Sequence, residues 1–401
     1  MILSKLTSKI LNSIQKVIRK KKSTDLVQLH EPFFEDTNCL EYIKDCVESG
    51  WVSSAGEWVN KFEEKICMFT GANYAVAVTN GTVGLRLALH SIGVRHGDEV
   101  LVPPLSFVAT ANAVSHLGAT PHFIDVENKS LGISAIALEK RLNEIGLKKN
   151  GKVFNKETGK RISALVPVHV FGNPADLFSL SKVAKSWGIP IIEDAAEALG
   201  SWHKIDNKKI HCGLTGDIGV ISFNGNKLIT TGGGGILITN NEKFANNLRH
   251  LSTTAKLKHQ WEFDHDEIAW NDRLPNLNAA MGYAQLEVIE NRLLMKRNLF
   301  DLYKKYLSNI NEIELIESSD NSISNYWLIT ISLKFDELSR LKKERHELLF
   351  EAHNMKLMLR PIWKPLHKLN IYQNSPKGNL TVAENFEYRI INLPSSPQLI
   401  L

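Results

Sequence analysis

Residues 74–94, YAVAVTNGTVGLRLALHSIGV, join a short apolar run to a helical pattern through the polar turn TNGT. The first five residues are apolar without a break, and the leucines that follow recur at helical spacing. Similar apolar runs lie near Val100, Phe123, Val166 and Ile191, with helical patterns such as residues 176–188 between them. Continuous apolar strands that alternate with helices indicate an α/β fold whose mostly parallel sheet is covered on both faces.

The pattern changes from about Glu290. Long helical stretches follow, with a short strand pair within residues 325–333 and a helical pattern over residues 342–354. We therefore predict a large domain over residues 28–285 and a smaller C-terminal α/β domain over residues 286–401, preceded by a basic segment at residues 1–27.

Charge and composition exclude several classes of protein. The formal charge of +5 arises in residues 1–22, which carry seven Lys/Arg and no acid, so the other 379 residues hold 41 basic and 43 acidic side chains. This near-neutral body argues against a nucleic-acid binder, and no apolar run approaches the ~20 residues of a membrane span. The four cysteines (Cys39, Cys46, Cys67, Cys212) form no CxxC pair, which favours reduced thiols in the cytoplasm and no metal site.

The basic segment has one apolar helical face, formed by Leu3, Leu6, Ile10, Ile14, Val17 and Ile18. It lacks the cleavage site and long apolar core of a secretory signal. A basic amphipathic helix can lie on an anionic membrane surface. For residues 1–22 we therefore predict either a weak, peripheral membrane contact or a frayed, solvent-exposed N-terminal segment.

Three polar residues follow predicted strands, where open α/β sheets bind ligands. Asp194 follows IPII, Gly81 and Thr82 begin a helix, and Lys227 lies in SFNGNKLITTGGGG (residues 222–235). Taken alone, each has an ordinary structural explanation as a helix cap, a helix start or a surface lysine. Together they supply the groups that a cofactor would need. Lys227 offers an amine for an aldehyde, Asp194 a carboxylate for a pyridine nitrogen, and the turn at Gly81 and Thr82 a seat for a phosphate. Phe107 offers an aromatic ring to cover the cofactor. This set indicates pyridoxal 5'-phosphate chemistry.

From about residue 28 to the C-terminus the chain resembles the DegT/StrS-type nucleotide-sugar aminotransferases. The resemblance rests on GWVSSAGEWVNKFE, NGTVGLRLAL, PPLSFVATANAV, EDAAEALGS, GDIGVISFNGNKLITTGGGG and NDRLPNLNAAMGYAQLE. It implies the fold-type I architecture of pyridoxal phosphate enzymes: a large domain with a mostly parallel, seven-stranded sheet covered by helices, and a smaller C-terminal α/β domain.

The resemblance also assigns roles to residues. Lys227 would hold the cofactor aldehyde and be the catalytic residue, Asp194 would contact the pyridine nitrogen, and Glu197 would lie near the ring oxygen. Phe107 would stack on the ring. Gly81, Thr82 and Ser222 would hold the phosphate, and Asn271 would reach the phosphate of a partner subunit, which makes a homodimer obligatory. The glycines at 232–235 would let backbone pass close to the cofactor or the partner.

The resemblance implies L-glutamate as amino donor, with the cofactor alternating between pyridoxal and pyridoxamine 5'-phosphate. Residues 27–34, 50–59 and 359–374 are most similar to the branch that aminates C4 of UDP-linked 2-acetamido-2,6-dideoxy-4-keto-hexoses, which lead to bacillosamine or legionaminic acid in surface glycans such as lipopolysaccharide O-antigen. Trp51, Ser53 and Ser54 would lie near the sugar or near the site of the partner subunit. Arg360, Trp363 and His367 would contact the diphosphate or base, or serve only in packing.

Three alternatives stay open at this point. A GDP-linked 4-keto-6-deoxymannose substrate, which gives perosamine, uses the same machinery. A regulator could bind the cofactor without turnover. A membrane-surface scaffold could be built on residues 1–22.

Overall fold

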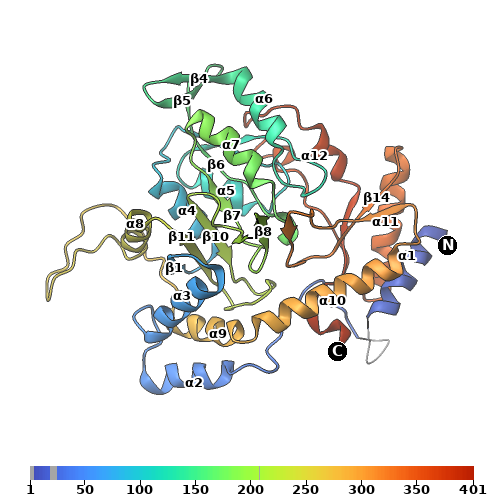
Figure 1. Cartoon of the computed structure of the whole chain (residues 1–401), viewed down its shortest axis with the longest axis horizontal. Helices are drawn as coiled ribbons and strands as arrows, with labels where there is room; N and C mark the ends of the chain where they lie inside the picture. The colour runs from blue at the N-terminus through green and yellow to red at the C-terminus, as the bar shows by residue number, and fades with distance from the viewer. Residues whose placement is uncertain (1–3, 19–24, 207) are drawn as a thin grey trace.

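The computed structural model describes residues 4–18, 25–206 and 208–401. Its central sheet has the strand order β1-β11-β10-β7-β6-β2-β3 (Figure 1). Parallel bridges Leu165–Ile191 and Val168–Asp194 join β6 to β7, and only β11 runs antiparallel to its neighbours within this order. The predicted mostly parallel, seven-stranded sheet is confirmed. The strands are β1 Tyr74–Val78, β2 Glu99–Val102, β3 Thr120–Phe123, β6 Arg161–Leu165, β7 Ile192–Asp194, β10 Ile218–Ser222 and β11 Gly235–Thr239.

Burial explains why these strands read as unbroken apolar runs. Every residue of β2, β10 and β11 is buried. Alternate side chains of β1 enter different cores: Val76 and Val78 pack with α4 and α8, whereas Ala75 and Ala77 pack with α3 and α9. The helices of this part are α2 Cys39–Ser49, α3 Glu57–Thr70, α4 Gly81–Ser91, α5 Ala109–Ser115, α6 Ala135–Ile145, α7 Leu177–Trp187, α8 Glu242–Ser252 and α9 Asn276–Leu286.

A second, antiparallel sheet has the order β12-β14-β16-β15 and lies beside α10 and α11 (Figure 1). Its strands are β12 Ile313–Leu315, β14 Thr330–Leu333, β15 Arg360–Pro361 and β16 Ile390–Asn392. The remaining helices are α10 Ile289–Leu307, α11 Leu338–Asn354, α12 Thr381–Phe386 and the short η1 Val170–Gly172, η2 Leu366–Lys368 and η3 Pro397–Ile400. The predicted boundary at residue 285 falls near the end of α9 and stays a prediction.

The N-terminal segment differs from both sequence-based expectations. Residues Lys5–Val17 form α1, which packs on α10 and α11. Its apolar face is buried, with Ile10 and Ile14 at 0 % exposure in one core with Leu299 and Leu348. The helix is therefore not a solvent-exposed segment, and its apolar face is covered by α10 and α11 and not available to a membrane. Leu3 and residues 19–22 lie outside the described residues.

Three hairpin-like features were not expected from the sequence. The hairpin of β4 Gly146–Lys149 and β5 Lys152–Asn155 extends β6, and β8 Trp202–Ile205, β9 Lys208–His211 and β13 Ser322–Ile323 form a small sheet. An arm over residues 253–271, held by the antiparallel bridges Thr253–Asn271 and Lys256–His265, extends away from the body beside α8 (Figure 1).

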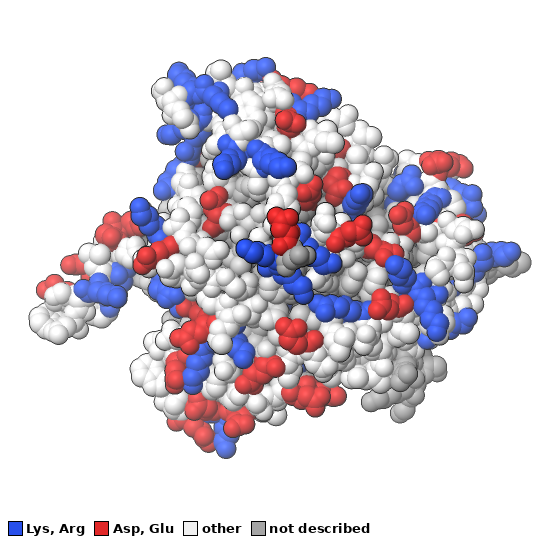
Figure 2. Space-filling model, viewed as in Figure 1, with Lys and Arg blue, Asp and Glu red and all other residues white. Residues whose placement is uncertain are grey.

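Charges of both signs are mixed on the face shown in Figure 2, with acidic side chains gathered over α2 and α3 at the bottom. Within the described ranges, no helix combines the length and the apolar character needed to cross a bilayer.

Candidate active site

Lys227 lies in the turn that follows β10. The turn is closed by a hydrogen bond from the Lys227 amide to the Asn224 carbonyl (3.0 Å). The Lys227 Nζ lies 3.3 Å from Glu197 Oε1 and 3.9 Å from the centroid of the Trp327 ring, and the side chain is 13 % exposed. Trp327 is fixed in turn because its Nε1 donates to the Asn226 carbonyl (2.7 Å). The amine is thus held between a carboxylate and an aromatic face.

Asp194 ends β7 and is 5 % exposed. Its Oδ2 accepts a hydrogen bond from Thr110 Oγ1 (2.7 Å), and its Oδ1 accepts one from the Ala196 amide (3.2 Å). The Thr110 hydroxyl also contacts Ser106 Oγ (2.6 Å). Burial raises the pKa of Asp194, although these two donors and the charge of Lys227 oppose the rise. A cationic ring nitrogen is the partner that would stabilise this buried carboxylate.

Glu197 is the carboxylate that contacts the lysine amine. Its Oε2 accepts from the Phe171 amide (2.7 Å), and its carbonyl accepts from Asn325 Nδ2 (2.9 Å). Burial raises the pKa of Glu197, against the effects of Lys227 and of the Phe171 amide. Two carboxylates, Asp194 and Glu197, therefore share one buried environment with one lysine.

The start of α4 has the geometry that the predicted phosphate seat requires, although phosphate binding itself stays a prediction. Asn80 caps the helix, with its Oδ1 accepting from the Val83 amide (2.9 Å). The amides of Gly81 and Thr82 come before this bond, in the first turn, where helix geometry gives no internal acceptor. Gly81 lies against β10, because a Cβ on it would be 3.1 Å from the Ser222 Cβ. Gly81, Thr82 and Ser222 are therefore brought together.

The glycine run at 232–235 lies close to the start of α4 in its own chain, and its predicted approach to the cofactor or a partner stays a prediction. Gly232 has φ +78°, which favours glycine. A Cβ on Gly235 would lie 2.6 Å from the Asn80 carbonyl carbon and 2.8 Å from the Gly81 amide nitrogen. In the described chain this run therefore makes room for the α4 turn of its own subunit. It fixes the lysine turn and the phosphate seat relative to each other.

Phe107 is 57 % exposed and adjoins Ser106, whose hydroxyl belongs to the hydrogen-bond chain to Asp194. This position is compatible with a ring that covers the cofactor. The stacking itself stays a prediction.

Asn271 does not join this cluster in its own chain. It is exposed at the base of the arm, paired through its backbone with Thr253. Its role toward a partner subunit stays a prediction.

The three predicted sugar contacts near the N-terminus lie in the exposed loop between α2 and α3. The Asn276 side chain donates to the Trp51 carbonyl (2.6 Å), and the Asn276 amide donates to the Ser53 carbonyl (2.9 Å). Ser54 is exposed beside them. Through Asn278, whose Nδ2 donates to the Thr231 carbonyl (2.6 Å), the start of α9 also holds the glycine run.

The three substrate contacts predicted in the C-terminal domain lie in different surroundings. Arg360 is exposed on β15, and the Trp363 ring packs on Phe171 with centroids 4.8 Å apart. His367 is 6 % exposed, and its Nε2 lies 3.0 Å from Glu384 Oε1. This position favours the packing alternative for His367.

Sequence reasoning missed several residues of the site. Thr110 lies three residues after Phe107 at the start of a helix, a spacing that could have revealed it. Trp327 lies 100 residues after Lys227 and Phe171 precedes Glu197 by 26, with no sequence signal that links them.

A buried His169–His203–Cys212 group has ligand atoms within 4.8 Å of one another. Both ring nitrogens of His169 are already used, by Glu193 Oε2 (2.9 Å) and by the Ala175 amide (3.1 Å). The group therefore does not offer a free metal ligand at His169.

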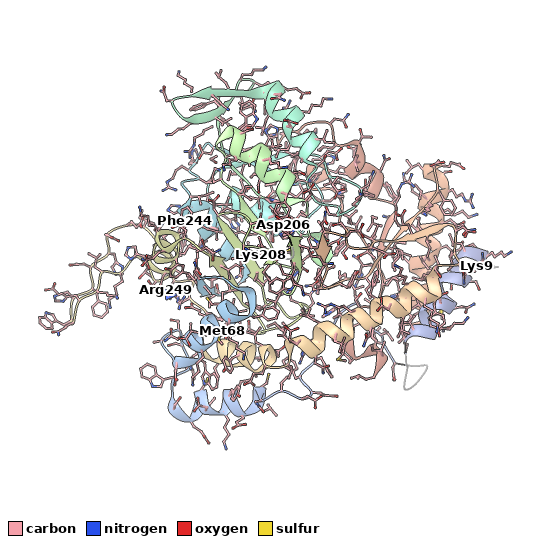
Figure 3. The ribbon with its side chains drawn as sticks, viewed as in Figure 1. Lys9, Met68, Asp206, Lys208, Phe244 and Arg249 are labelled. Atoms are coloured by element: carbon pink, nitrogen blue, oxygen red, sulfur yellow. The ribbon has the colours of Figure 1, made fainter. Side chains whose placement is uncertain are left out.

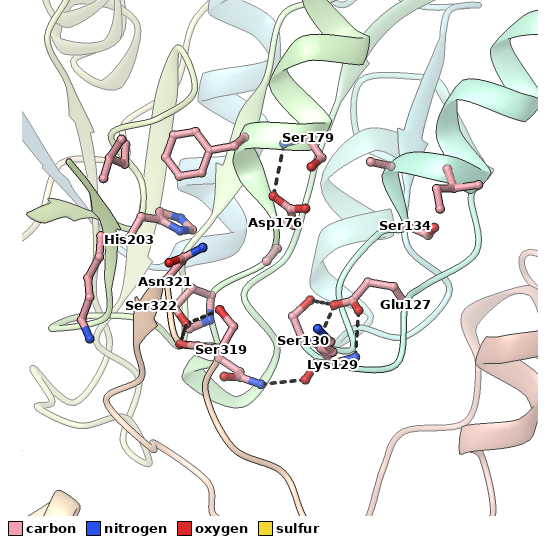
Figure 4. Close-up of a pocket in the computed structure, with 18 of the residues that line it drawn as sticks. Glu127, Lys129, Ser130, Ser134, Asp176, Ser179, His203, Ser319, Asn321 and Ser322 are labelled. Atoms are coloured by element: carbon pink, nitrogen blue, oxygen red, sulfur yellow. Dashed lines mark hydrogen bonds between the residues drawn. The ribbon is translucent and has the colours of Figure 1, made fainter.

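A hollow of about 830 Å³ lies between the starts of α6 and α7 and the strands β8 and β13. The side chains that line it include Glu127, Ser130, Asp176, His203 and Ser322 (Figure 4). None of the predicted cofactor residues lines it. The hollow is distinct from the cluster around Lys227.

The cluster fits pyridoxal phosphate on its own geometry. A lysine amine, a buried carboxylate in need of a cationic partner, and a helix start with a neighbouring serine are the groups that would meet the aldehyde, the ring nitrogen and the phosphate. This fit agrees with the expectation from the sequence.

Comparison with known proteins supports the same conclusion. Residues 34–400 match the profile of the DegT/DnrJ/EryC1/StrS aminotransferase family. The chain is 35 % identical over 359 residues to GDP-perosamine synthase of Escherichia coli O157:H7, which covers 90 % of each chain. It is 32 % identical over 377 residues to GDP-perosamine synthase of Vibrio cholerae, covering 93 % of this chain and 95 % of the other. A crystal structure of a DegT DnrJ EryC1 StrS aminotransferase from Brucella abortus has a TM-score of 0.79 at 27 % identity and covers 90 % of each chain.

Proposed function

The chain belongs to the DegT/DnrJ/EryC1/StrS aminotransferase family and is a pyridoxal phosphate-dependent sugar aminotransferase, and we propose that it transfers an amino group from L-glutamate to C4 of a GDP-linked 4-keto-6-deoxymannose. One observation carries the choice of sugar: the similarity to GDP-perosamine synthases over at least nine-tenths of the chain. These relatives favour the GDP-linked alternative over the UDP-linked bacillosamine or legionaminic-type sugar that the sequence motifs indicated.

The residues of the site support an aminotransferase. Bound pyridoxal phosphate supplies an aldehyde carbon that accepts the amine and a protonated ring that withdraws electrons. With the cofactor bound, the Lys227 amine would move a proton at the donor Cα and at the aldehyde carbon, as base and then as acid. Glu197, whose Oε1 lies 3.3 Å from the amine, would position the lysine, and Asp194 would hold the ring nitrogen protonated.

We further propose that the enzyme acts as a homodimer in the cytoplasm. The arm supports this because Trp261, Phe263 and Ile268 on it are 71 %, 73 % and 91 % exposed. Large apolar side chains gathered on a projecting segment are typical of an interaction surface. Asn271 at the base of this arm would then complete the phosphate seat of the partner.

The test follows the absorbance of the lysine-bound cofactor in purified enzyme. L-Glutamate should remove this absorbance, GDP-4-keto-6-deoxymannose should restore it, and a UDP-linked 4-keto-sugar should not. Lys227→Ala should lack the absorbance and turn over at least about 10³-fold more slowly. Restoration by the UDP-sugar alone would overturn the choice of nucleotide, and failure of every amino donor would favour a cofactor-binding regulator without turnover.

A further inference from the structure

Beside the active-site lysine, the described chain buries three basic side chains with no ion pair. Arg292 is 2 % exposed, Lys296 is 0 % exposed and His30 is 7 % exposed. Arg292 and Lys296 lie four residues apart on α10 and so share a face of the helix. No carboxylate of the described residues lies within ion-pair distance of either.

Trp327 links this group to the active site. The Lys296 Nζ donates to the Trp327 carbonyl (2.9 Å) and to the Ser395 carbonyl. The ring of His30 lies 6.4 Å from that of Trp327, centroid to centroid, and the Lys227 amine lies 3.9 Å above the same indole. Burial lowers the pKa of His30, and the charges of Lys296, Lys227 and Arg292 lower it further, whereas the nearby Asn226 backbone opposes the shift.

The polar atoms of Arg292 and His30 are unpartnered. Arg292 Nε and Nη2 and both ring nitrogens of His30 are buried without a hydrogen bond among the described residues. The guanidinium lies 5.2 Å from the centroid of the Phe33 ring. Burial lowers the pKa of Arg292 to about 10, only partly offset by Cys39 and Asp36. A buried guanidinium without hydrogen bonds is costly, and such groups call for a ligand or another specific explanation.

We propose that Arg292 and His30 form an anion subsite that binds a carboxylate of the amino donor. The proposal rests on the proposed function, which supplies an amino acid as donor. The two N–H groups of Arg292 suit a planar carboxylate, which a guanidinium binds through two parallel hydrogen bonds. The neutral imidazole of His30 adds one further donor.

The position favours a carboxylate over a nucleotide phosphate. The amino group of the donor exchanges with Lys227, so the donor carboxylate is only a few bonds from the reacting nitrogen. The phosphates of a nucleotide sugar are separated from the reacting carbon by the sugar ring. His30 lies beside the Trp327 ring that also contacts the Lys227 amine, so the proposed subsite is placed for the donor.

The experiment compares Arg292→Met with Lys305→Met, which removes an exposed positive charge from the same helix. In the holoenzyme, the L-glutamate concentration that half-discharges the cofactor absorbance is measured without any sugar. Calorimetry gives the dissociation constants of glutarate, a dicarboxylate without the amine, and of GDP. The melting temperature of each variant is recorded without ligand, and the dimer is checked by sedimentation.

Arg292→Met should raise both the half-discharging glutamate concentration and the glutarate dissociation constant by about 10- to 100-fold. It should leave GDP binding unchanged, and Lys305→Met should change none of these values. The ligand-free Arg292→Met protein should melt at the same temperature or higher, because an unpaired buried charge has been removed. His30→Ala should weaken glutarate binding by a smaller factor.

Three results would overturn the inference. In the first, Arg292→Met leaves both the glutamate dependence and the glutarate dissociation constant unchanged. In the second, GDP binding weakens while glutarate binding is unchanged. In the third, the variant melts at a lower temperature and loses its dimer, which would identify Arg292 as a structural cation. If no amino donor discharges the wild-type enzyme, the proposed function fails instead. In that case glutarate binding still tests the subsite independently.

Discussion

At the scale of single residues, the candidate site contains buried carboxylates whose pKa is set by burial and by a few hydrogen-bond donors. Asp194 is held by the Thr110 hydroxyl and the Ala196 amide while burial raises its pKa. A carboxylate must be ionised to pair with a protonated ring nitrogen. We therefore expect each donor to Asp194 to contribute to cofactor affinity.

Thr110→Val should weaken binding of pyridoxal phosphate about tenfold or more, because a hydrogen bond to a charged acceptor contributes roughly 1.5–3 kcal/mol. Ser106→Ala is the matched control, since Ser106 contacts Thr110 and not Asp194. The measurement is the cofactor dissociation constant from titration of the cofactor-free protein.

The same variant should alter the pH dependence of cofactor binding. Loss of a donor raises the pKa of Asp194 further, and the carboxylate is ionised only above its pKa. Affinity should therefore fall at a higher pH in Thr110→Val than in the wild-type protein as the pH is lowered. Parallel pH profiles for the two proteins would contradict this account.

At the scale of elements, the glycine run couples two turns. Gly235→Ala would place a Cβ 2.6 Å from the Asn80 carbonyl carbon, so the α4 turn must move. We expect at least about tenfold weaker cofactor binding from the displaced phosphate seat. Gly225→Ala is the control, because nothing lies within 4 Å of its added Cβ. Equal affinities of the two variants would show that the contact is unimportant.

The N-terminal helix makes a second prediction at this scale. Ile10→Ala should lower the free energy of unfolding by about 2–5 kcal/mol, because it leaves a cavity between α1 and its neighbours. Lys9→Ala should have little effect, since Lys9 lies on the outer side of α1 (Figure 3). Urea unfolding measures both. If Ile10→Ala instead left stability unchanged and reduced binding to anionic vesicles, the membrane interpretation would return.

Helices and strands were predicted best from the sequence where one regular spacing of apolar residues extends over the whole element. The strand–turn–helix at residues 74–94 and the strand that ends at Asp194 were predicted from their apolar patterns. The meeting of Asp194, Thr82 and Lys227 was predicted because open α/β sheets bind ligands where their strands end. The amphipathic pattern of α1 was recognised, but its partner was not, because 271 residues separate the end of α1 from the start of α10. Trp327 and the group formed by His30 and Arg292 were missed for the same reason, because their partners are also distant in the sequence. Local patterns do not report which distant surface will cover them.

At the scale of the whole molecule, the active site of one chain is expected to need a second chain. Lys227 lies in the body, whereas Asn271 lies at the base of a projecting arm. The two residues should therefore serve different sites of a dimer.

Mixing inactive Lys227→Ala with Asn271→Ala subunits after mild dissociation should restore roughly a quarter of the wild-type activity, because half of the random dimers contain one intact site. Mixing Lys227→Ala with Asp194→Asn should restore none, since both residues belong to the same chain's site. Failure of the first mixture to regain activity, with hybrid dimers confirmed by mass spectrometry, would contradict a shared site.

The packing of α1 also has a consequence for the order of synthesis. This helix leaves the ribosome before the helices that cover its apolar face, because α10 and α11 emerge only after about 290 and 340 further residues. At roughly 5–20 residues per second, the uncovered helix waits on the order of 15–60 s for its partners. During that interval the nascent chain presents a basic amphipathic helix to every chaperone and anionic surface nearby, a property that the finished enzyme no longer has.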